Sequence, residues 1–533
     1  MPKLTLPGLL ARCTVACIVP SLLTAAACHS TDEARGGGTS TITILYPADE
    51  RVLGPSWDDS PKFLVFLPLV NFENPRQCGE PTGALAERWE HSSDYRVWTV
   101  WLRHGVRWHD GVPVTADDIE FTIDLLKHPD VLSYNAGPVD SVQVLDERSV
   151  QFFLSKPDRW PLEGWATFYP KHLLEVLDPK AFYEWEFWTR PVGNGPYRYE
   201  RHVPQTMMEL EANPDYYRGK PRIDRLVLRF TAAGSGSGLL EMRSGNADLI
   251  SILTPLQASE LAEDPSFRAY YRVSTSHTRW LAYNPGHHFL GNRLVRRALT
   301  QAIDRSVVHQ VLGYREDVPL TDAPYTSCQF SRGELTEPWP YDPAASARSL
   351  EEADWRDEDG DGVRERDGMD ARFTTIVAGS EERAALVVQD QLRRLGVRME
   401  VQTLDGTLVR DRLRDGEFEA GIPPIVRIEE LLAPSPFLPL YADTTLVEAY
   451  PRIVQLIDTS RGEPDFGERE RLYRELAPEF REALPATYLY PMVYPIVAKR
   501  RIRGFNHDGW IPPAWRWPFG GVEFLWIDDG RRP

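Results

Sequence analysis

The sequence has few cysteines, no excess of basic residues, and no long hydrophobic run after its first 28 residues. Only two of its five cysteines lie beyond residue 28, so a small fold held together by disulfides is excluded. The chain has 60 Lys and Arg and 78 Asp and Glu, so its net charge is −18. The absence of a basic stripe argues against nucleic-acid binding. With 42% hydrophobic and 26% charged residues in 533, the chain is typical of a globular protein of about three to four domains.

The residue patterns of common enzymes are also missing. Gly234-Ser235-Gly236-Ser237-Gly238 has glycine where a G-x-S-x-G motif needs serine, and neither H-E-x-x-H nor a P-loop is present. Carboxylate pairs such as Asp58-Asp59 and Glu429-Glu430 are common in an acidic chain and do not by themselves indicate glycosidase chemistry. We therefore expect no catalytic residues and no cofactor, and we keep an exported hydrolase with paired carboxylates as an alternative.

One acidic segment resembles half of a calcium-binding loop. Asp357, Asp359 and Asp361, followed by Gly362, match positions one, three, five and six of an EF-hand. Position twelve falls on Gly368, where an EF-hand has a bidentate glutamate. We expect an acidic surface turn and no metal, with a weak calcium site as the alternative.

The N-terminus has the pattern of an export signal. Residues 1–28 carry two basic residues and an apolar stretch, and they end in Ala25-Ala26-Ala27-Cys28. Small residues before a cysteine resemble the bacterial lipobox, although Ala25 stands where leucine is usual, so we expect Cys28 to be lipidated. Plain cleavage after the A-x-A sequence and a retained anchor are the alternatives. Residues 29–41, which include three consecutive glycines, are expected to form a flexible tether.

An exported body permits one disulfide. Cys78 and Cys328 are the only candidates, and they lie 250 residues apart with no local pattern that brings them together. The chain also holds 16 tryptophans, most of which we expect in the core or between lobes, with some lining a ligand cleft.

Strand and helix patterns alternate along the chain, which predicts a mixed α/β architecture. Thr115 and Asp118 form a capping box that predicts a helix start, and Asp342-Pro343 predicts another. Gly313 and Gly396 are expected to end helices. The expected strands cover 41–46, 97–102, 225–230 and 397–401, and the expected helices cover 292–312, 342–353 and 382–395.

Seven ordered blocks between residues 42 and 510 resemble one protein family. They are LRHGVRWHDGVPVTADD at 102–118, PVGNGPY at 191–197, NPDYY at 213–217, RSGNAD at 243–248, VRRA at 295–298 with AIDR at 302–305, YDP at 341–343 with DGDG at 359–362, and QLRRLGV at 391–397. In this order they resemble the family 5 extracellular solute-binding proteins, the oligopeptide-, dipeptide- and nickel-binding components of ABC importers.

The resemblance implies a two-lobed clamshell of mixed α/β composition with an extra inserted subdomain. Lobe 1 is expected to comprise 40–65, 190–278 and 495–533, the insertion 66–189, and lobe 2 279–494. Hinge strands are expected near 274–284 and 489–500. The Gly193-Asn194-Gly195-Pro196 turn is expected to let the backbone cross tightly between lobes.

The resemblance also suggests ligand contacts. In peptide-binding relatives an aspartate after a Gly-Trp segment binds the N-terminal amine of the peptide; here the tryptophan is absent, and Glu430 is the nearest match. Glu429 and Glu430 as merely solvated residues are the alternative. The other candidates rest on their position after the first strand, at the expected hinge and before a helix: Trp57, Asp58, Asp59, Trp280, Tyr283 and Ser380.

The function that the resemblance implies is capture by domain closure. A peptide or similar small solute bridges the lobes, stabilises the closed state and is delivered to ABC permease subunits. We expect a periplasmic or extracellular, lipid-anchored monomer that does not bind nucleic acid. A receptor that reports a ligand without transporting it is a further alternative.

Overall fold

The computed structural model describes most of the chain beyond residue 38. The described residues are 39–47, 62–71, 82–131, 139–157, 167–231, 236–251, 253–315, 318, 337–423, 449–463, 465–505 and 522–528. The predicted signal peptide, Cys28, Cys78 and Cys328 lie outside them.

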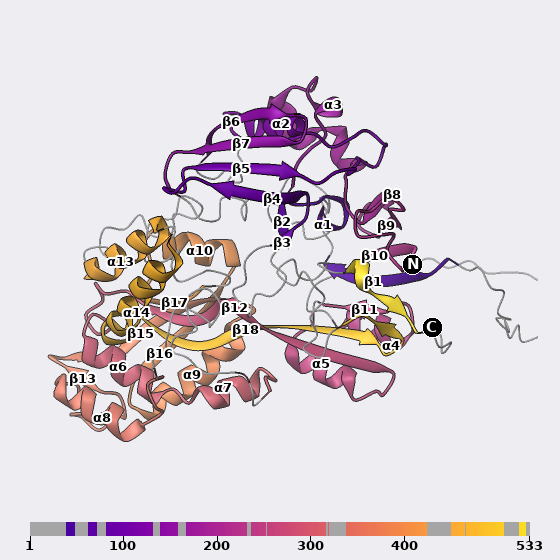
Figure 1. Cartoon of the computed structure of the whole chain (residues 1–533). Coiled ribbons are helices and arrows are strands. Elements are labelled where there is room, and N and C mark those ends of the chain that lie inside the picture. Colours follow the sequence, from indigo (N-terminus) through magenta and orange to yellow (C-terminus); the bar gives the residue numbers. More distant parts are fainter. Residues whose placement is uncertain are drawn as a thin grey trace, which may run out of the picture. The chain divides into compact units, whose positions relative to one another are not determined.

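The largest element is a sheet of ten strands with order β16-β15-β17-β12-β18-β11-β1-β10-β9-β8 (Figure 1). Two parallel groups, β1 with β10 and β11, and β15 with β16 and β17, flank one antiparallel pair, β12 and β18. The strands are β1 Thr41–Pro47, β8 Tyr197–Val203, β9 Met207–Ala212, β10 Arg225–Thr231, β11 Leu249–Ile250, β12 Phe267–Tyr283, β15 Arg372–Ala378, β16 Arg398–Leu404, β17 Ala420–Ile422 and β18 Ala486–Lys499. The mixed α/β composition predicted from the alternating patterns is confirmed.

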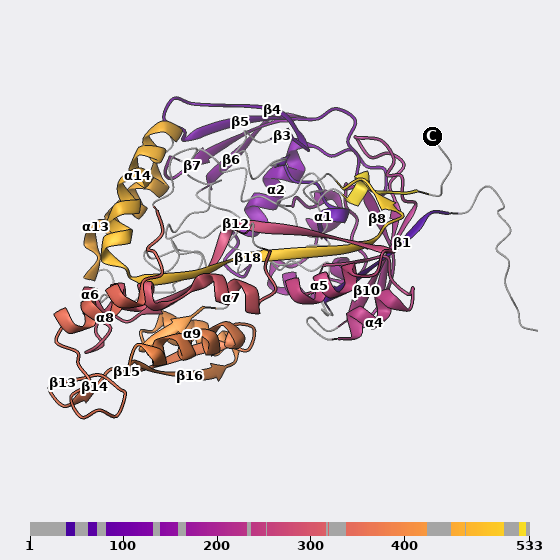
Figure 2. The ribbon, with the colours of Figure 1, turned by 90° about the horizontal axis from the view of Figure 1, so that it is seen from below.

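The pair β12 and β18, which we call the central ribbon, joins the two parallel groups (Figure 2). Phe267 pairs with Lys499 at one end of the ribbon, and Ala282 pairs with Ala486 at the other. The register shifts twice in between, once between Val273 and Thr278 and once between Arg279 and Trp280. Such irregularities bend a strand locally, so the middle of the ribbon is where the sheet departs from regular pairing.

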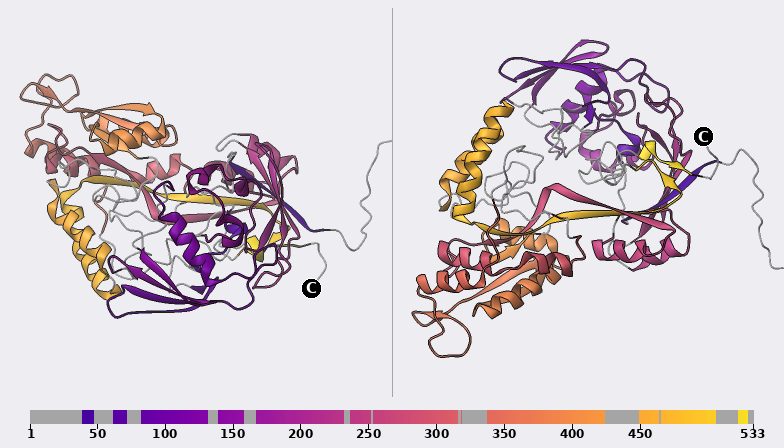
Figure 3. Two further views of the ribbon diagram at one scale, coloured as in Figure 1. Left: turned by 90° about the horizontal axis from the view of Figure 1, so that it is seen from above. Right: turned by 60° about the horizontal axis from the view of Figure 1, so that its bottom comes forward.

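Helices cover the sheet, and their ends follow the capping patterns of the sequence. The predicted capping box of Thr115 and Asp118 is present at α2, Asp342 caps α8, and Gly396 follows α9 with a φ of 82°. The helices are α1 Lys62–Val65, α2 Ala116–Leu126, α3 Lys171–Leu174, α4 Ser237–Arg243, α5 Pro255–Ala262, α6 Arg293–Ala302, α7 Arg305–Val311, α8 Pro343–Glu352, α9 Glu382–Arg394, α10 Gly406–Arg414, α13 Pro451–Gly462 and α14 Phe466–Ala483. Figure 3 shows α13 and α14 side by side.

The prediction of one helix over 292–312 is wrong, because the structure contains two. Ile303 adopts an extended conformation (φ −91°, ψ 109°) and ends α6, and Asp304 begins α7 by accepting a hydrogen bond from the backbone N–H of Ser306. Apolar residues at helical spacing continue through the break, so the periodicity conceals it. The sequence signal of the second start is Asp304 itself, because an aspartate before a helix accepts from the backbone N–H two residues later.

A second sheet of four strands has order β4-β5-β7-β6, with one face against α2. Trp98, Val100 and Phe152 are buried on that face with Ile119 and Ile123 of α2. The strands are β4 Ala86–His91, β5 Val97–Leu102, β6 Val139–Asp146 and β7 Ser149–Leu154. Short pairs of strands complete the structure: β2 Val70–Asn71 with β3 Thr82–Gly83, β13 Glu365–Arg366 with β14 Met369–Asp370, and β19 Ile502–Arg503 with β20 Trp526–Ile527.

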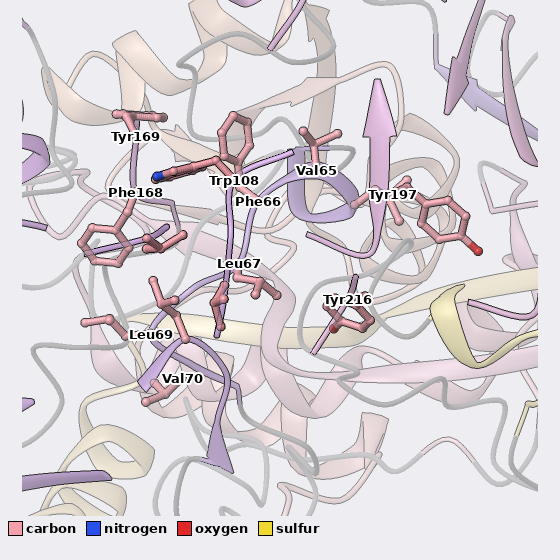
Figure 4. Close-up of a cluster of buried hydrophobic side chains, with 14 of the residues drawn as sticks. Val65, Phe66, Leu67, Leu69, Val70, Trp108, Phe168, Tyr169, Tyr197 and Tyr216 are labelled. Atoms are coloured by element: carbon pink, nitrogen blue, oxygen red, sulfur yellow. The ribbon is translucent and has the colours of Figure 1, made fainter. Parts of the chain in front are cut away.

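The segment from Leu64 to Val70 connects the two sheets through the largest hydrophobic core. Figure 4 shows its side chains near Trp108, Phe168 and Tyr169, and the rings of Phe66 and Tyr169 meet edge to face at 6.0 Å. This core also includes Ile42 and Leu226 of the ten-stranded sheet. Burial of this many large side chains is the dominant favourable term that holds the two sheets together.

The turn at 193–195 passes directly against this segment. The backbone N–H groups of Asn194 and Gly195 both donate to the carbonyl of Val65, at 3.0 and 2.7 Å, and the side-chain oxygen of Asn194 accepts from the N–H of Leu67 at 2.8 Å. A Cβ atom on Gly193 would lie 1.9 Å from the Val65 carbonyl oxygen. The two glycines are therefore required by a close backbone approach.

His109 fastens the same turn from the other side. Its Nδ1 accepts a hydrogen bond from the N–H of Gly193 at 3.3 Å, so Nε2 carries the proton and donates to the carbonyl of Gly195 at 3.1 Å. Burial lowers the pKa of His109 to about 4, because the charged ring would be poorly solvated. A protonated Nδ1 would also be unable to accept the hydrogen bond from the N–H of Gly193.

This depressed pKa predicts acid sensitivity. As the pH falls from about 6.5, the pKa in the unfolded chain, toward 4, the unfolded chain takes up a proton before the folded one, and the stabilisation from His109 falls by up to about 3 kcal/mol. His109→Gln does not titrate, so the difference in Tm between wild type and this variant should shrink from pH 7 to pH 4. A difference that stays constant over this range would contradict the assignment.

Candidate functional site

The two parallel groups of strands direct their carboxyl ends toward the middle of the central ribbon. β11 and the first half of β12 run in the same direction, because both pair antiparallel with residues 497 and 498 of β18. β17 pairs antiparallel with the last residues of β12, so it runs back toward the middle. Ligands of open α/β sheets bind outside the carboxyl ends of parallel strands, and here two such edges face the same segment.

Five of the seven predicted ligand contacts follow these carboxyl ends. Ser380 comes two residues after β15, Glu430 follows β17, and Trp57, Asp58 and Asp59 follow β1. Of these, only Ser380 lies within the described residues. The position along the chain relative to the strands agrees with a ligand site, and the contacts themselves remain predictions.

The other two predicted contacts, Trp280 and Tyr283, lie on β12 and are buried. Trp280 is 2% exposed and packs with Ile457 of α13 and Leu476 of α14. Tyr283 is 1% exposed, and its hydroxyl lies 2.6 Å from Oγ1 of Thr487 on β18. In this structure both side chains serve the packing of the ribbon, and a role in ligand binding remains a prediction.

The structure adds a buried ion pair that the sequence analysis missed. Nε of Arg279 lies 2.9 Å from Oε1 of Glu381, and the two side chains are 4% and 2% exposed. Ser380 donates its hydroxyl to the other oxygen of Glu381. Burial raises the pKa of the Glu381 carboxyl, and the charge of Arg279 opposes that shift. Ser380 is thereby linked to the central ribbon.

Two tyrosines complete the surroundings of Arg279. Tyr490 of β18 is its direct partner across the ribbon, and the ring of Tyr314 meets the ring of Tyr490 edge to face at 5.7 Å. Burial is the main cause that raises the pKa of both hydroxyls, so they are neutral hydrogen-bonding groups at physiological pH. We name Arg279, Glu381, Ser380, Tyr314 and Tyr490 the ribbon cluster.

A sequence signal for Arg279 did exist. Arg279 directly precedes the apolar and aromatic residues Trp280 to Tyr283, in the middle of the expected hinge strand 274–284. A cation inside such a strand needs a buried partner, and the acidic residues after Ser380 offered one. The partner itself was not predictable, because 102 residues separate the two.

The acidic loop brings its three aspartates together. Single carboxylate oxygens of Asp357, Asp359 and Asp361 lie within 4.8 Å of one another, and all three residues are exposed. Asp357 accepts backbone N–H groups from Gly360 and Gly362, at 2.7 and 3.1 Å. These hydrogen bonds are those of an acidic turn, and calcium binding remains a prediction.

Comparison with known proteins agrees with this architecture. The family model described as bacterial extracellular solute-binding proteins, family 5, matches residues 80–441. The oligopeptide-binding protein AppA of Bacillus subtilis is 25% identical over 343 residues, which are 62% of each chain. An ABC transporter peptide-binding protein of Brucella ovis is 28% identical over 296 residues, 54% of this chain and 55% of that one. The match thus spans about half the length of the latter relative.

Solved structures show the same fold over nearly the whole chain. AppA in complex with a nonapeptide superposes with a TM-score of 0.70 at 20% identity, covering 91% of this chain and 98% of that one. NikZ of Campylobacter jejuni in complex with Ni(L-His) superposes with a TM-score of 0.71 at 22% identity, covering 92% and 99%. The predicted two-lobed solute-binding fold is confirmed by these structures.

Two further observations bear on the nature of the protein. No helix among the described residues combines the length and the hydrophobicity that a membrane span requires. The family is defined by solute binding, which agrees with the prediction of a binding protein that is not an enzyme. The extent of the family match, together with the shared fold, establishes that the chain belongs to the family 5 bacterial extracellular solute-binding proteins.

Proposed function

We propose that this protein is the substrate-binding component of an ABC importer and that it captures peptides between its two lobes. The observation that carries the proposal is the pair of carboxyl edges that face the middle of the central ribbon. A solute bound there contacts both halves of the sheet at once. Relatives named for oligopeptide and peptide binding support peptides as the ligand class.

Closure follows from the same geometry. The ribbon is the connection that pairs strands of both halves, and its register shifts mark where it bends. A ligand that contacts both edges binds the closed arrangement better than the open one and therefore shifts the population toward it. The closed form is then the one that permease subunits recognise.

The attachment and the division into lobes form part of the same proposal. Cys28 carries a lipid, 29–41 tether the body, and the body is a monomer that stands away from the membrane. Lobe 1 comprises 40–65, 190–278 and 495–533, the insertion comprises 66–189, and lobe 2 comprises 279–494.

Treatment with a signal peptidase specific for lipoproteins, followed by mass spectrometry of the new N-terminus, tests the lipid on Cys28.

Peptide binding is tested by thermal unfolding of the purified protein with alanine peptides of three, five and nine residues. A peptide that binds only the folded state stabilises it by about 2.7 kcal/mol at a concentration of 100 times its Kd, so Tm should rise. The same peptides hydrolysed to free alanine serve as the control. The proposal fails if no peptide raises Tm while a sugar mixture or nickel with histidine does, and recovery of cleaved peptide would favour the hydrolase alternative.

A further inference from the structure

Arg279 uses only part of its hydrogen-bonding capacity. Its Nε donates to Glu381, but Nη1 is buried and has no acceptor among the residues that the structure describes. A guanidinium carries five N–H donors, and a buried donor without an acceptor costs about 1 to 3 kcal/mol. Other buried polar atoms of the described residues, such as Nε of Arg297 and Nε1 of Trp355, also have no described hydrogen-bond partner, so the missing acceptor indicates a ligand only together with the place of Arg279 in the fold.

The position of Arg279 points to a ligand. It lies at the second register shift of the central ribbon, in the segment that both carboxyl edges face. Glu381, its ion-pair partner, immediately precedes α9, a helix of 13 residues whose first backbone N–H groups point out of its N-terminus. The unpartnered side of the guanidinium therefore belongs to the place where a bound solute is expected.

The charges of the ribbon cluster determine which kind of ligand group can accept a hydrogen bond from Arg279. Glu381 already neutralises Arg279, and Tyr314 and Tyr490 are uncharged. Glu382, the first residue of α9, is exposed and accepts a hydrogen bond from the hydroxyl of Thr403 at 2.9 Å, so its carboxylate adds only a solvent-screened negative charge near the same helix terminus. Within the ribbon cluster Arg279 is the only cation, and Glu381 already neutralises it, so a ligand carboxylate would place a further negative charge in a low-dielectric environment, whereas a neutral oxygen carries no such cost.

We infer that Arg279 is a specificity-determining residue that donates through its free Nη1 to an uncharged carbonyl oxygen of the ligand. In a peptide this is a backbone amide carbonyl, so the ribbon cluster binds the interior of the peptide and leaves its charged ends to other parts of the cleft. The inference rests on the proposed function and adds the chemistry of one contact. Planar guanidinium groups suit this role because they direct several donors from a fixed fork.

The test measures binding of penta-alanine, with either a free carboxylate or an amide at its C-terminus, by isothermal titration calorimetry of the full mature chain. Arg279→Lys keeps a cation beside Glu381 but loses the fork. The double variant Arg279→Gln, Glu381→Gln removes both charges, so no unpaired buried charge remains. Tyr450→Phe removes another buried hydroxyl without a described partner, in the core under α13 and α14, and is the matched control. Circular dichroism establishes that each variant is folded.

The affinities of wild type and variants for the two peptides either support or overturn the role of Arg279. The inference expects both Arg279 variants to bind the free and the amidated peptide about tenfold to a hundredfold more weakly, and Tyr450→Phe to bind within twofold of wild type. Unchanged affinity in either folded Arg279 variant overturns the inference and leaves the proposed function intact. A loss confined to the free-acid peptide shows that Arg279 takes a carboxylate and also overturns it. If wild type binds neither form of penta-alanine, the inference is overturned, whereas the proposed function is decided by the thermal unfolding test with all three peptide lengths.

Discussion

Replacing Gly193 with alanine is expected to reduce the free energy of unfolding by more than about 3 kcal/mol. The added Cβ atom would lie 1.9 Å from the carbonyl oxygen of Val65, and this oxygen already accepts hydrogen bonds from Asn194 and Gly195. The clash involves two stretches of backbone, so no rotation of a side chain relieves it. Separation of the two backbone segments would break both hydrogen bonds and the packing of the core beneath them. Urea unfolding followed by circular dichroism measures the loss.

A matched glycine distinguishes this clash from the general effect of adding a methyl group. Gly236 also has a negative φ, and nothing lies within 4 Å of a Cβ atom built on it. Gly236→Ala should change the free energy of unfolding by less than about 1 kcal/mol. Equal losses in the two variants would show that the close approach of Gly193 to Val65 is not what requires glycine.

Arg296→Met is expected to cost about 3 to 5 kcal/mol of the free energy of unfolding. The guanidinium of Arg296 is buried, with 5% of the residue exposed, and it donates to four backbone carbonyls at 2.7 to 2.9 Å. Two of these, Ala483 and Leu484, end α14, and the other two belong to the turn before α6. Methionine fills similar volume and donates nothing, so all four acceptors lose a partner inside the protein.

Arg293 on the same helix provides the comparison. Its side chain is 61% exposed and makes an ion pair with Glu482 at 3.4 Å, and exposed pairs of this kind contribute less than about 1 kcal/mol. Denaturant midpoints of Arg293→Met and Arg296→Met should therefore differ widely. A small loss for Arg296→Met would mean that water can replace the guanidinium at α14, against the burial described above.

Local structure was largely predictable from the sequence, because its causes are local. The caps of Thr115 and Asp342 and the strand alternation at 225–230 depend on residues within a few positions of one another, and all three predictions are confirmed. The break at Ile303 was missed because apolar spacing continues through it. Gly193 was correctly expected in a tight crossing, but its partner Val65 lies 128 positions earlier in the chain, beyond any local pattern.

The candidate site was predictable only in part. Ser380 was expected just before a helix and Trp280 on a strand, and the structure confirms both positions along the chain, whereas the hinge at this strand stays a prediction. Which side chains meet was not predictable, because Arg279 and Glu381 are joined by the pairing of distant strands. That pairing also decides that Trp280 faces α13 and α14, while Arg279 faces α9.

The place of β18 in the sheet has a consequence for the order of folding. Residues 486–499 form an inner strand between β11 and β12, yet they are synthesised after every other strand of this sheet. Until they arrive, the two halves of the sheet have no shared strand pairing, and such long sequence separations slow folding. In a chain exported as proposed, the sheet cannot be completed until residues 486–499 have crossed the membrane, so the joining of its two halves follows the passage of this strand.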